Sequence, residues 1–378
     1  MDAVLALLHD LVAIDSVNPS LVRGAAGEAR VAAHIADVCL AAGLEVHVTE
    51  VAPGRPNVVA LVEGQAPGRT LMLCGHTDTV GVGDAMVSPF GPREHGGRLY
   101  GRGAQDMKGG VAAMIDAARQ ITARGGLARG RLVVAAVVDE EYASIGADAL
   151  VREWTADAAV VTEPTDMRMA VAHKGFAGVE VVTTGVAAHG SRPQDGRDAI
   201  FRMARVIGAL EQLDRDLQAG RTHPLLGPAS LHASIIEGGR EASTYPDTCR
   251  LLMERRTIPG EPSERALDEV QAILASLAAR DPEFHATART TLARDPYEID
   301  PLAELPQVLG RLAASRGLDP APTGVSFWTD AQILSAAGIP TVVLGPGGAG
   351  LHSDEEYVHT SDVIACRDLL VALADAYL

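Results

Sequence analysis

Short apolar runs alternate with amphipathic segments over the first part of the chain, a pattern typical of an α/β protein. Each apolar run is closed by Gly, Pro or charged residues, as expected for buried strands. Leu and Val recur at steps of three and four in the segments between them, which predicts helices with one buried face. The predicted strands are residues 44–49, 57–62, 70–75, 131–138 and 158–162, and the predicted helices are residues 1–15, 25–42 and 111–122.

The pattern changes at residue 175. Residues 175–184 alternate as a half-exposed strand, and they begin a unit of strand, helix, two strands, helix and strand that ends at residue 292. The α/β pattern then resumes with predicted helices at 302–315, from 329 and at 362–377, and with a strand at 341–344. We therefore expect an α/β protein whose main domain, residues 1–174 and 293–378, has a mostly parallel sheet flanked by helices. Residues 175–292 would be an inserted α+β sandwich.

Polar side chains follow several of the predicted strands of the main domain. His76 and Asp78 come directly after Gly75, and the carboxyl ends of parallel strands meet at one edge of a sheet. Spaced as His-x-Asp, the carboxylate can hold the imidazole in one tautomer. The candidate donors are His76, Asp106, Glu140, Glu141, Glu163 and His352, with Asp78 behind His76.

Imidazole and carboxylate donors without thiolate suit Zn, Co or Mn. Six such donors are about what a hydrolytic site with two ions about 3.5–4 Å apart needs. The four cysteines are far apart in sequence and are predicted to be buried, reduced thiols that form neither disulfides nor a thiolate zinc site. The sequence therefore predicts two divalent ions, with Zn favoured over Co or Mn.

The composition of the chain limits which partners the protein is expected to bind and where in the cell it is expected. At 378 residues the chain exceeds one compact domain, and its formal charge of -17 opposes binding to nucleic acid. The first apolar segment has an acidic residue and no basic residue ahead of it, so no signal peptide is expected. We expect a cytoplasmic protein without membrane contact.

Taken together, eight segments resemble the M20 metallopeptidase and amidohydrolase family, nearest to its acetylornithine deacetylase and succinyl-diaminopimelate desuccinylase-like members. The segments are GHTDT (75–79), GRGAQDMKGG (101–110), DEE (139–141), TEPT (162–165), HKG (173–175), AHGSRP (188–193), ERRTIPGE (254–261) and GPGGAGLHSDEEYV (345–358). The resemblance spans nearly the whole chain. It implies that the inserted part is a lid that also forms a homodimer.

The resemblance also implies a role for each donor. His76 and Glu163 would hold one ion, Glu141 and His352 the other, and Asp106 would bridge them. Asp78 would orient His76. Glu140 would be the general base that takes a proton from the attacking water.

Two residues of the inserted part complete the expected site. His189 resembles the family's transition-state donor across the dimer interface, and Arg256 resembles the arginine that holds the substrate carboxylate. Each residue taken alone could instead be an ordinary exposed side chain.

The expected activity is hydrolysis of the N-acyl amide bond of an N-acylated amino acid. Cleavage of a short peptide by a dipeptidase or a glutamate-type carboxypeptidase is the alternative, and a non-catalytic binding protein is a more remote one.

Overall fold

The chain forms two compact units in a computed structural model that describes residues 2–378. Unit 1 comprises Met1–Val171, Ile299–Thr323 and Thr329–Leu378, and unit 2 comprises Ala172–Glu298 and Gly324–Trp328. The insertion expected at 175–292 lies inside unit 2. Residues 324–328, expected in the main domain, also belong to unit 2, because the Trp328 ring packs against His173 and Phe176 with ring centroids 6.0 Å apart in both pairs.

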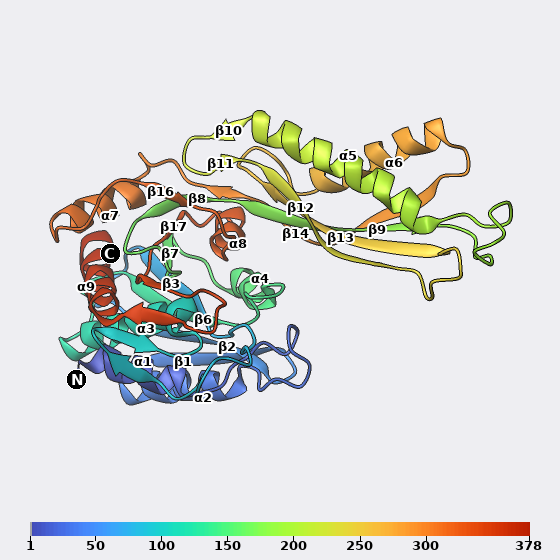
Figure 1. Ribbon diagram of the computed structural model, residues 1–378. Helices are drawn as coiled ribbons and strands as arrows, with labels where there is room; N and C mark the ends of the chain where they lie inside the picture. Colours follow the sequence, from blue (N-terminus) through green and yellow to red (C-terminus); the bar gives the residue numbers. More distant parts are fainter. Residues whose placement is uncertain (1) are drawn as a thin grey trace. The chain divides into compact units, whose positions relative to one another are not determined.

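A large mixed sheet forms the centre of unit 1 (Figure 1). In pairing order its longer and central strands are β1 (Glu45–Ala52), β2 (Arg55–Glu63), β6 (Arg131–Val137), β3 (Thr70–His76), β7 (Ala158–Val161), β17 (Thr341–Val343) and β8 (Ala170–His173). The short strands β15 (Tyr297–Glu298) and β16 (Thr323–Val325) both pair with β8. The predicted α/β class is confirmed. Only β6, β3, β7 and β17 run parallel, so the sheet is mixed rather than mostly parallel. At one edge β2 runs antiparallel to both β6 and β1, and β1 and β2 form a hairpin around the two residues Pro53 and Gly54.

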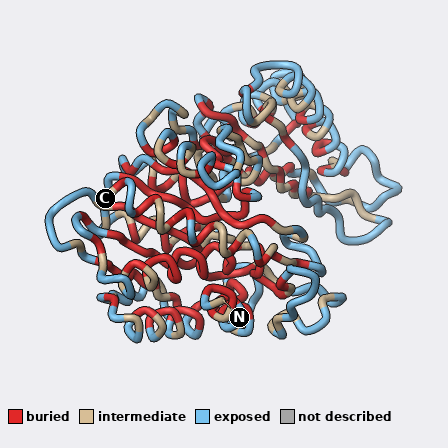
Figure 2. Tube along the Cα trace, turned by 90° about the vertical axis from the view of Figure 1, so that its left-hand side faces the viewer, coloured by how far each residue is buried: buried red, intermediate tan, exposed pale blue. Residues whose placement is uncertain are grey.

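Helices cover both faces of this sheet. One face packs against α1 (Ala3–Val12), α2 (Ala29–Ala41), α3 (Gly109–Ala123), α7 (Glu304–Ala314) and α9 (Thr360–Tyr377), and the other against α4 (Ile145–Glu153) and α8 (Ala331–Ala336). The central strands are almost wholly buried (Figure 2). Buried strands cannot present polar side chains along their length, so polar groups accumulate at the strand ends.

A second, small sheet of unit 1 brings distant segments together. It pairs β18 (Gly348–Ala349), β19 (Tyr357–His359), β5 (Arg98–Tyr100) and β4 (Arg93–His95). Two- and three-residue strands carry no periodic signal, which is why the sequence did not predict them. Because β19 lies beside β5, the loop after Ala349 is held next to the segment that follows Tyr100.

Unit 2 is an antiparallel sheet with helices on one face. The sheet order is β12 (Ser230–Gly238), β13 (Thr248–Thr257), β9 (Gly175–Thr184) and β14 (His285–Arg294), and the helices are α5 (Ala199–Ala219) and α6 (Arg265–Arg280). Leu251 and Met253 of β13 point into the helix-covered core, while the intervening Leu252 and Glu254 are half-buried. The short strands β10 (Thr222–His223) and β11 (Gly227–Pro228) complete the described elements.

Two details differ from the sequence prediction. The helix expected at 25–42 begins only at Ala29. Residues 25–27 have no regular structure after the turns at 19–24, and the Glu28 side chain is buried in an ion pair with Arg55. Helix α4 and strand β8 were not predicted, since each is short and lies between polar loops. All four cysteines are free and buried, as expected.

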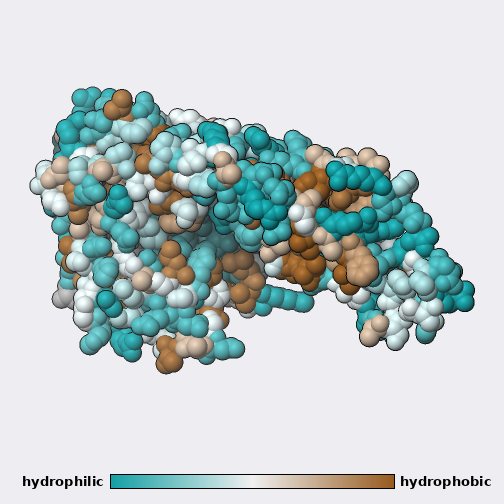
Figure 3. Space-filling model, turned by 45° about the horizontal axis from the view of Figure 1, so that its top comes forward, coloured by the Kyte–Doolittle hydropathy of each residue, from teal (hydrophilic) through white to brown (hydrophobic). Residues whose placement is uncertain are grey.

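On the face drawn in Figure 3, hydrophilic residues predominate, and the hydrophobic residues form several groups, the largest of which lies right of the centre of the view. Within residues 2–378, none of the helices combines the length and the apolar character needed to span a lipid bilayer.

Candidate metal centre

Strand β3 delivers His76 to the edge of the parallel part of the sheet. Its neighbours are β6 on one side and β7 on the other, and His76 is its last residue. The imidazole is 1% exposed. Its Nδ1 donates to the backbone carbonyl of Asp78 at 3.0 Å, so Nε2 is the ring nitrogen that faces the neighbouring acids.

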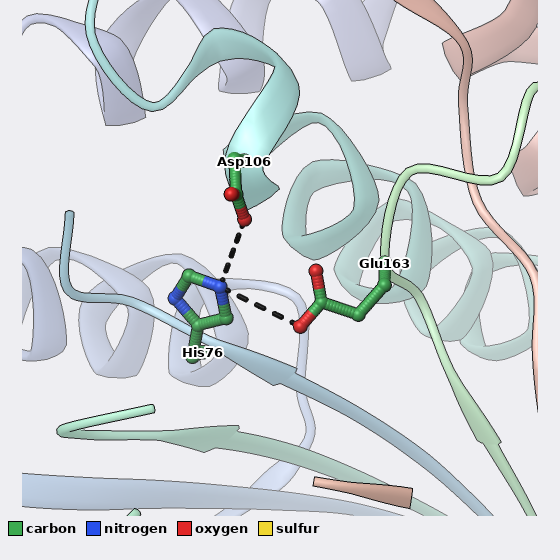
Figure 4. Close-up of side chains that lie close together, drawn as sticks. All are labelled: His76, Asp106 and Glu163. Carbon is green, nitrogen blue, oxygen red and sulfur yellow. Dashed lines mark hydrogen bonds and ion pairs between the residues drawn. The ribbon is translucent and has the colours of Figure 1, made fainter. Parts of the chain in front are cut away.

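The first donor group consists of His76, Asp106 and Glu163 (Figure 4). His76 Nε2 lies 3.1 Å from Asp106 Oδ1 and 3.6 Å from Glu163 Oε1. Glu163 follows the end of β7, and Asp106 lies in the short helical turn Ala104–Lys108 that precedes α3. The three side chains point toward one another from three separate elements, as the ligands of one ion do.

The second donor group consists of Asp106, Glu141 and His352. His352 Nε2 lies 3.3 Å from Asp106 Oδ2 and 3.2 Å from Glu141 Oε2. Asp106 therefore offers one carboxylate oxygen to each group. Such a carboxylate can bridge two ions, and the nitrogen and oxygen donors suit Zn, Co or Mn.

The donors also fit ions by their burial and charge. Glu141 Oε1 is buried and has no hydrogen-bond partner within residues 2–378. Burial, and then the nearby Asp106 carboxylate, raises the pKa of Glu141 to about 7. Burial raises the pKa of Glu163 as well. Buried carboxylates that crowd together in this way gain most from bound cations.

The same close packing of charged groups shifts the pKa values of the histidine and aspartate donors. Hydrogen bonds with Asp106 and then Glu141 raise the pKa of His352 to about 10. Burial alone would raise the pKa of Asp106, but its hydrogen bonds with His352 and His76 lower it below its usual range. The imidazoles and the carboxylates thus favour one another's charged forms.

Glu140 lies beside both groups without belonging to either. Its Oε2 is 3.9 Å from His76 Nε2, and the side chain is 11% exposed. Burial, and then the Glu163 carboxylate, raises its pKa well above the ordinary value. A carboxylate that is close to the donors but not needed as a ligand is available to move a proton.

Asp78 has more partners than the sequence indicated. Its Oδ1 is 3.6 Å from His76 Nδ1, farther than its own backbone carbonyl. Its carboxylate instead accepts from the backbone N–H groups of Glu140 and Glu141, both at 3.2 Å, and from Asn18 Nδ2 at 2.7 Å. Asp78 therefore ties the end of β3 to the loop that carries Glu140 and Glu141.

A buried polar network continues behind this loop. Asp139 accepts from Asn18 Nδ2 at 3.1 Å and forms an ion pair of 2.6 Å with Arg55, which also binds Glu28. Asp139 has a positive φ of 71°, so the chain turns sharply just before Glu140. Sequence reasoning missed Asn18 and Arg55. Asn18 lies in a turn cluster that could have been flagged, whereas nothing local marks Arg55.

His189 and Arg256 belong to unit 2 and are described within it. His189 is exposed, and its Nδ1 accepts from the backbone N–H of Ser191 at 3.2 Å. The neutral ring then carries its proton on Nε2. Arg256 is 31% exposed, donates from Nε to Glu254 at 2.6 Å, and lies over the Phe176 ring at 5.6 Å.

Comparisons with known proteins agree with this chemistry. The chain is 32% identical over 381 residues to the acetylornithine deacetylase of Myxococcus xanthus, with 98% of this chain and 96% of that protein covered. Among solved structures, a tripeptidase from Staphylococcus aureus matches with a TM-score of 0.83 at 22% identity, covering 99% and 98% of the two chains. A dinuclear metal-binding M20 peptidase from Bacillus subtilis matches with a TM-score of 0.74 at 16% identity, covering 99% and 98%.

Residues 72–376 match the peptidase family M20/M25/M40. That match covers most of the chain, including every residue of the two donor groups. The chain therefore belongs to the M20 peptidase family and is an enzyme of that type, a metal-dependent hydrolase of linear amide or peptide bonds.

Proposed function

We propose that the enzyme is a dinuclear hydrolase that cleaves the N-acyl amide bond of an N-acylated amino acid. The observation that carries the proposal is the pair of donor groups that share Asp106, with Glu140 alongside. The choice of an N-acyl amino acid is supported by the similarity to an acetylornithine deacetylase along nearly the whole chain. Hydrolysis of a short peptide is the second candidate, favoured by the likeness in fold to a tripeptidase.

His76 and Glu163 would hold one ion, Glu141 and His352 the other, and Asp106 both. Zn fits the nitrogen and oxygen donors, and Co and Mn fit them too. When bound, such a pair of ions polarises the amide carbonyl and lowers the pKa of the attacking water.

Glu140 is the general base in this proposal. Its carboxylate takes a proton from the attacking water and delivers it to the leaving amine nitrogen. Asp78 supports this task, because it binds the backbone N–H of Glu140 and so restrains the position of the base. Replacing Glu140 with Ala should lower kcat steeply while metal content is retained, since the side chain is needed for proton transfer and not for holding the ions.

Arg256 is the proposed anchor for the substrate carboxylate. Its Nε is engaged by Glu254, and the planar guanidinium has further donors in a fork that suits a carboxylate. Losing this contact should cost about 1.5–3 kcal/mol in kcat/KM. Substrates whose carboxylate is amidated should be poor for the wild type and little affected by Arg256→Ala.

His189 is the proposed donor to the developing oxyanion, supplied by the second subunit of a homodimer. Its Nε2–H is free of the local Ser191 contact and can donate. Dimerisation through unit 2 is supported by exposed apolar side chains on that unit, with Phe201 74% and Ile236 53% exposed. One oxyanion donor contributes about 3–4 kcal/mol at comparable sites.

Subunit mixing tests this arrangement. Inactive His189→Ala and inactive Glu140→Ala are combined and allowed to exchange subunits. If His189 acts on the partner's site, a mixed dimer has one site with both changes and one with neither, so activity returns to about a quarter of the wild-type value at random equal exchange. If no activity returns, His189 acts within its own chain or not at all.

The substrate class is tested with purified protein loaded with Zn²⁺ or Co²⁺. N-acetyl and N-succinyl amino acids are assayed beside dipeptides and tripeptides under identical conditions. The proposal expects the highest kcat/KM for an N-acyl amino acid. A clear preference for peptides would establish the second candidate, and metal binding without hydrolysis of any substrate would contradict both.

A further inference from the structure

Glu356 is a buried carboxylate whose hydrogen bonds converge on the segment that carries Asp106. It is 1% exposed. Its Oε2 accepts from Arg102 Nη1 at 2.7 Å and from the backbone N–H of Gly103 at 3.0 Å. Its Oε1 accepts from the backbone N–H groups of Gln105 at 2.9 Å and of Asp106 at 3.1 Å. A single side chain thus fixes the backbone on both sides of this turn.

The backbone of this turn is shaped to receive an anion. Gly103 has a φ of 80°, and a Cβ there would lie 2.7 Å from Thr79 Cγ2. Consecutive N–H groups that point to one place around a left-handed residue form a concave anion-binding site. Here the chain's own Glu356 fills that site, so the turn cannot relax without losing several hydrogen bonds to a charged group.

Arg102, the ion-pair partner of Glu356, also holds the loop that carries His352. Arg102 donates a second hydrogen bond, from Nη2 to the Ser353 carbonyl at 3.0 Å, and the Gly101 N–H donates to the Glu356 carbonyl at 3.2 Å. His352 itself is 54% exposed and has a φ of 58°, a backbone conformation that side chains other than glycine rarely adopt. Its loop therefore depends on these contacts for a defined position.

We propose that Glu356, paired with Arg102, is a positioning residue that aligns Asp106 with His352 and thereby determines how tightly the enzyme binds its ions. The inference rests on the proposed function, because it concerns the same two ions. Asp106 must aim one oxygen at each donor group, and it can do so only if its backbone is held. Groups that orient metal ligands from behind typically affect metal affinity by about 10- to 100-fold.

A purely structural role is the competing explanation, because an ion pair buried to this degree also affects stability. Arg102 is 2% exposed and Glu356 1%. The chain offers a matched control in Asp116, which is 2% exposed and forms a buried ion pair with Arg367 at 3.2 Å. Asp116 lies on α3 and is not among the metal-binding groups. Removing its charge perturbs a buried pair without touching the two loops.

The experiment compares the wild type, Glu356→Gln and Asp116→Asn after removal of metal. Each protein is titrated with Zn²⁺ against a chromogenic chelator, and the dissociation constants and the thermal midpoint of the metal-free protein are recorded. Glu356→Gln should weaken Zn²⁺ binding by about 10- to 100-fold. Asp116→Asn should lower the thermal midpoint and bind Zn²⁺ as the wild type does.

A second variant guards against misfolding. Glu356→Asp keeps the charge opposite Arg102 but is one methylene shorter, so it cannot reach both Gly103 and Asp106, and it should weaken Zn²⁺ binding less than Glu356→Gln. Wild-type affinity in either folded Glu356 variant overturns the inference and leaves the proposed function intact. A loss of affinity in Asp116→Asn as large as in Glu356→Gln overturns it too. A wild type that binds no Zn²⁺ refutes the proposed function itself.

Discussion

Replacing Gly110 with Ala should disable the metal centre from a position that is not a ligand. Gly110 lies in the first turn of α3, directly against the end of β7. A Cβ at this position would lie 2.0 Å from the carbonyl oxygen of Thr162 and 2.9 Å from its Cβ. Thr162 immediately precedes Glu163, so the added methyl group presses on the backbone that positions a proposed ligand.

The size of the effect follows from this geometry. Non-bonded carbon and oxygen atoms do not approach closer than about 3 Å, so the helix or the strand end must shift by about 1 Å. A misplacement of about 1 Å in a catalytic constellation can reduce the rate by about 100-fold. Overpacking of a filled interior typically costs about 1–3 kcal/mol of stability, so the protein should still fold.

The assay measures kcat, zinc affinity and the thermal midpoint of Gly110→Ala beside Gly208→Ala. Gly208 lies inside α5, and a Cβ there meets nothing within 4 Å. Gly208→Ala should therefore stabilise its helix by about 0.5–1 kcal/mol and leave kcat and zinc affinity unchanged. Wild-type kcat and zinc affinity in Gly110→Ala would refute the reasoning, because they would mean that the contact relaxes without moving Glu163.

Three further outcomes are expected. His352→Ala should lower the zinc content, measured by elemental analysis, from two ions per chain to one, because the donor group around His76 keeps all its donors. Two retained ions would contradict this. Arg55→Met should lower the free energy of unfolding, measured with denaturant, by about 3–5 kcal/mol, because it leaves the buried carboxylates of Glu28 and Asp139 without their cation. An unchanged midpoint of denaturant unfolding would contradict this expectation. Removing both ions with a chelator should abolish activity and lower the thermal midpoint of unfolding, because ions that bind only the folded state stabilise it. A thermal midpoint that does not change when zinc is added would argue against such binding.

Much of the site could be predicted from local sequence. The run LMLC at residues 71–74 is apolar without interruption and is followed by Gly75, which was enough to place His76 at the end of a buried strand. The same reasoning identified Glu140, Glu141 and Glu163 after the next two strands. The position of these residues at strand ends could be predicted because a buried strand excludes polar side chains until it reaches the edge of the sheet.

The tertiary structure alone decided how these residues are held. Arg102 and Glu356 are 254 positions apart, and neither belongs to a periodic pattern that would reveal the pair. The small sheet of β5 and β19 brings them together, and these short strands, each with only one buried residue, form no apolar run that would mark them in the sequence. Arg55 reaches Asp139 in the same way, through the pairing of β2 with β6. Periodicity along the chain reports which residues are buried, whereas the partner of a buried charge depends on long-range packing that no local pattern encodes.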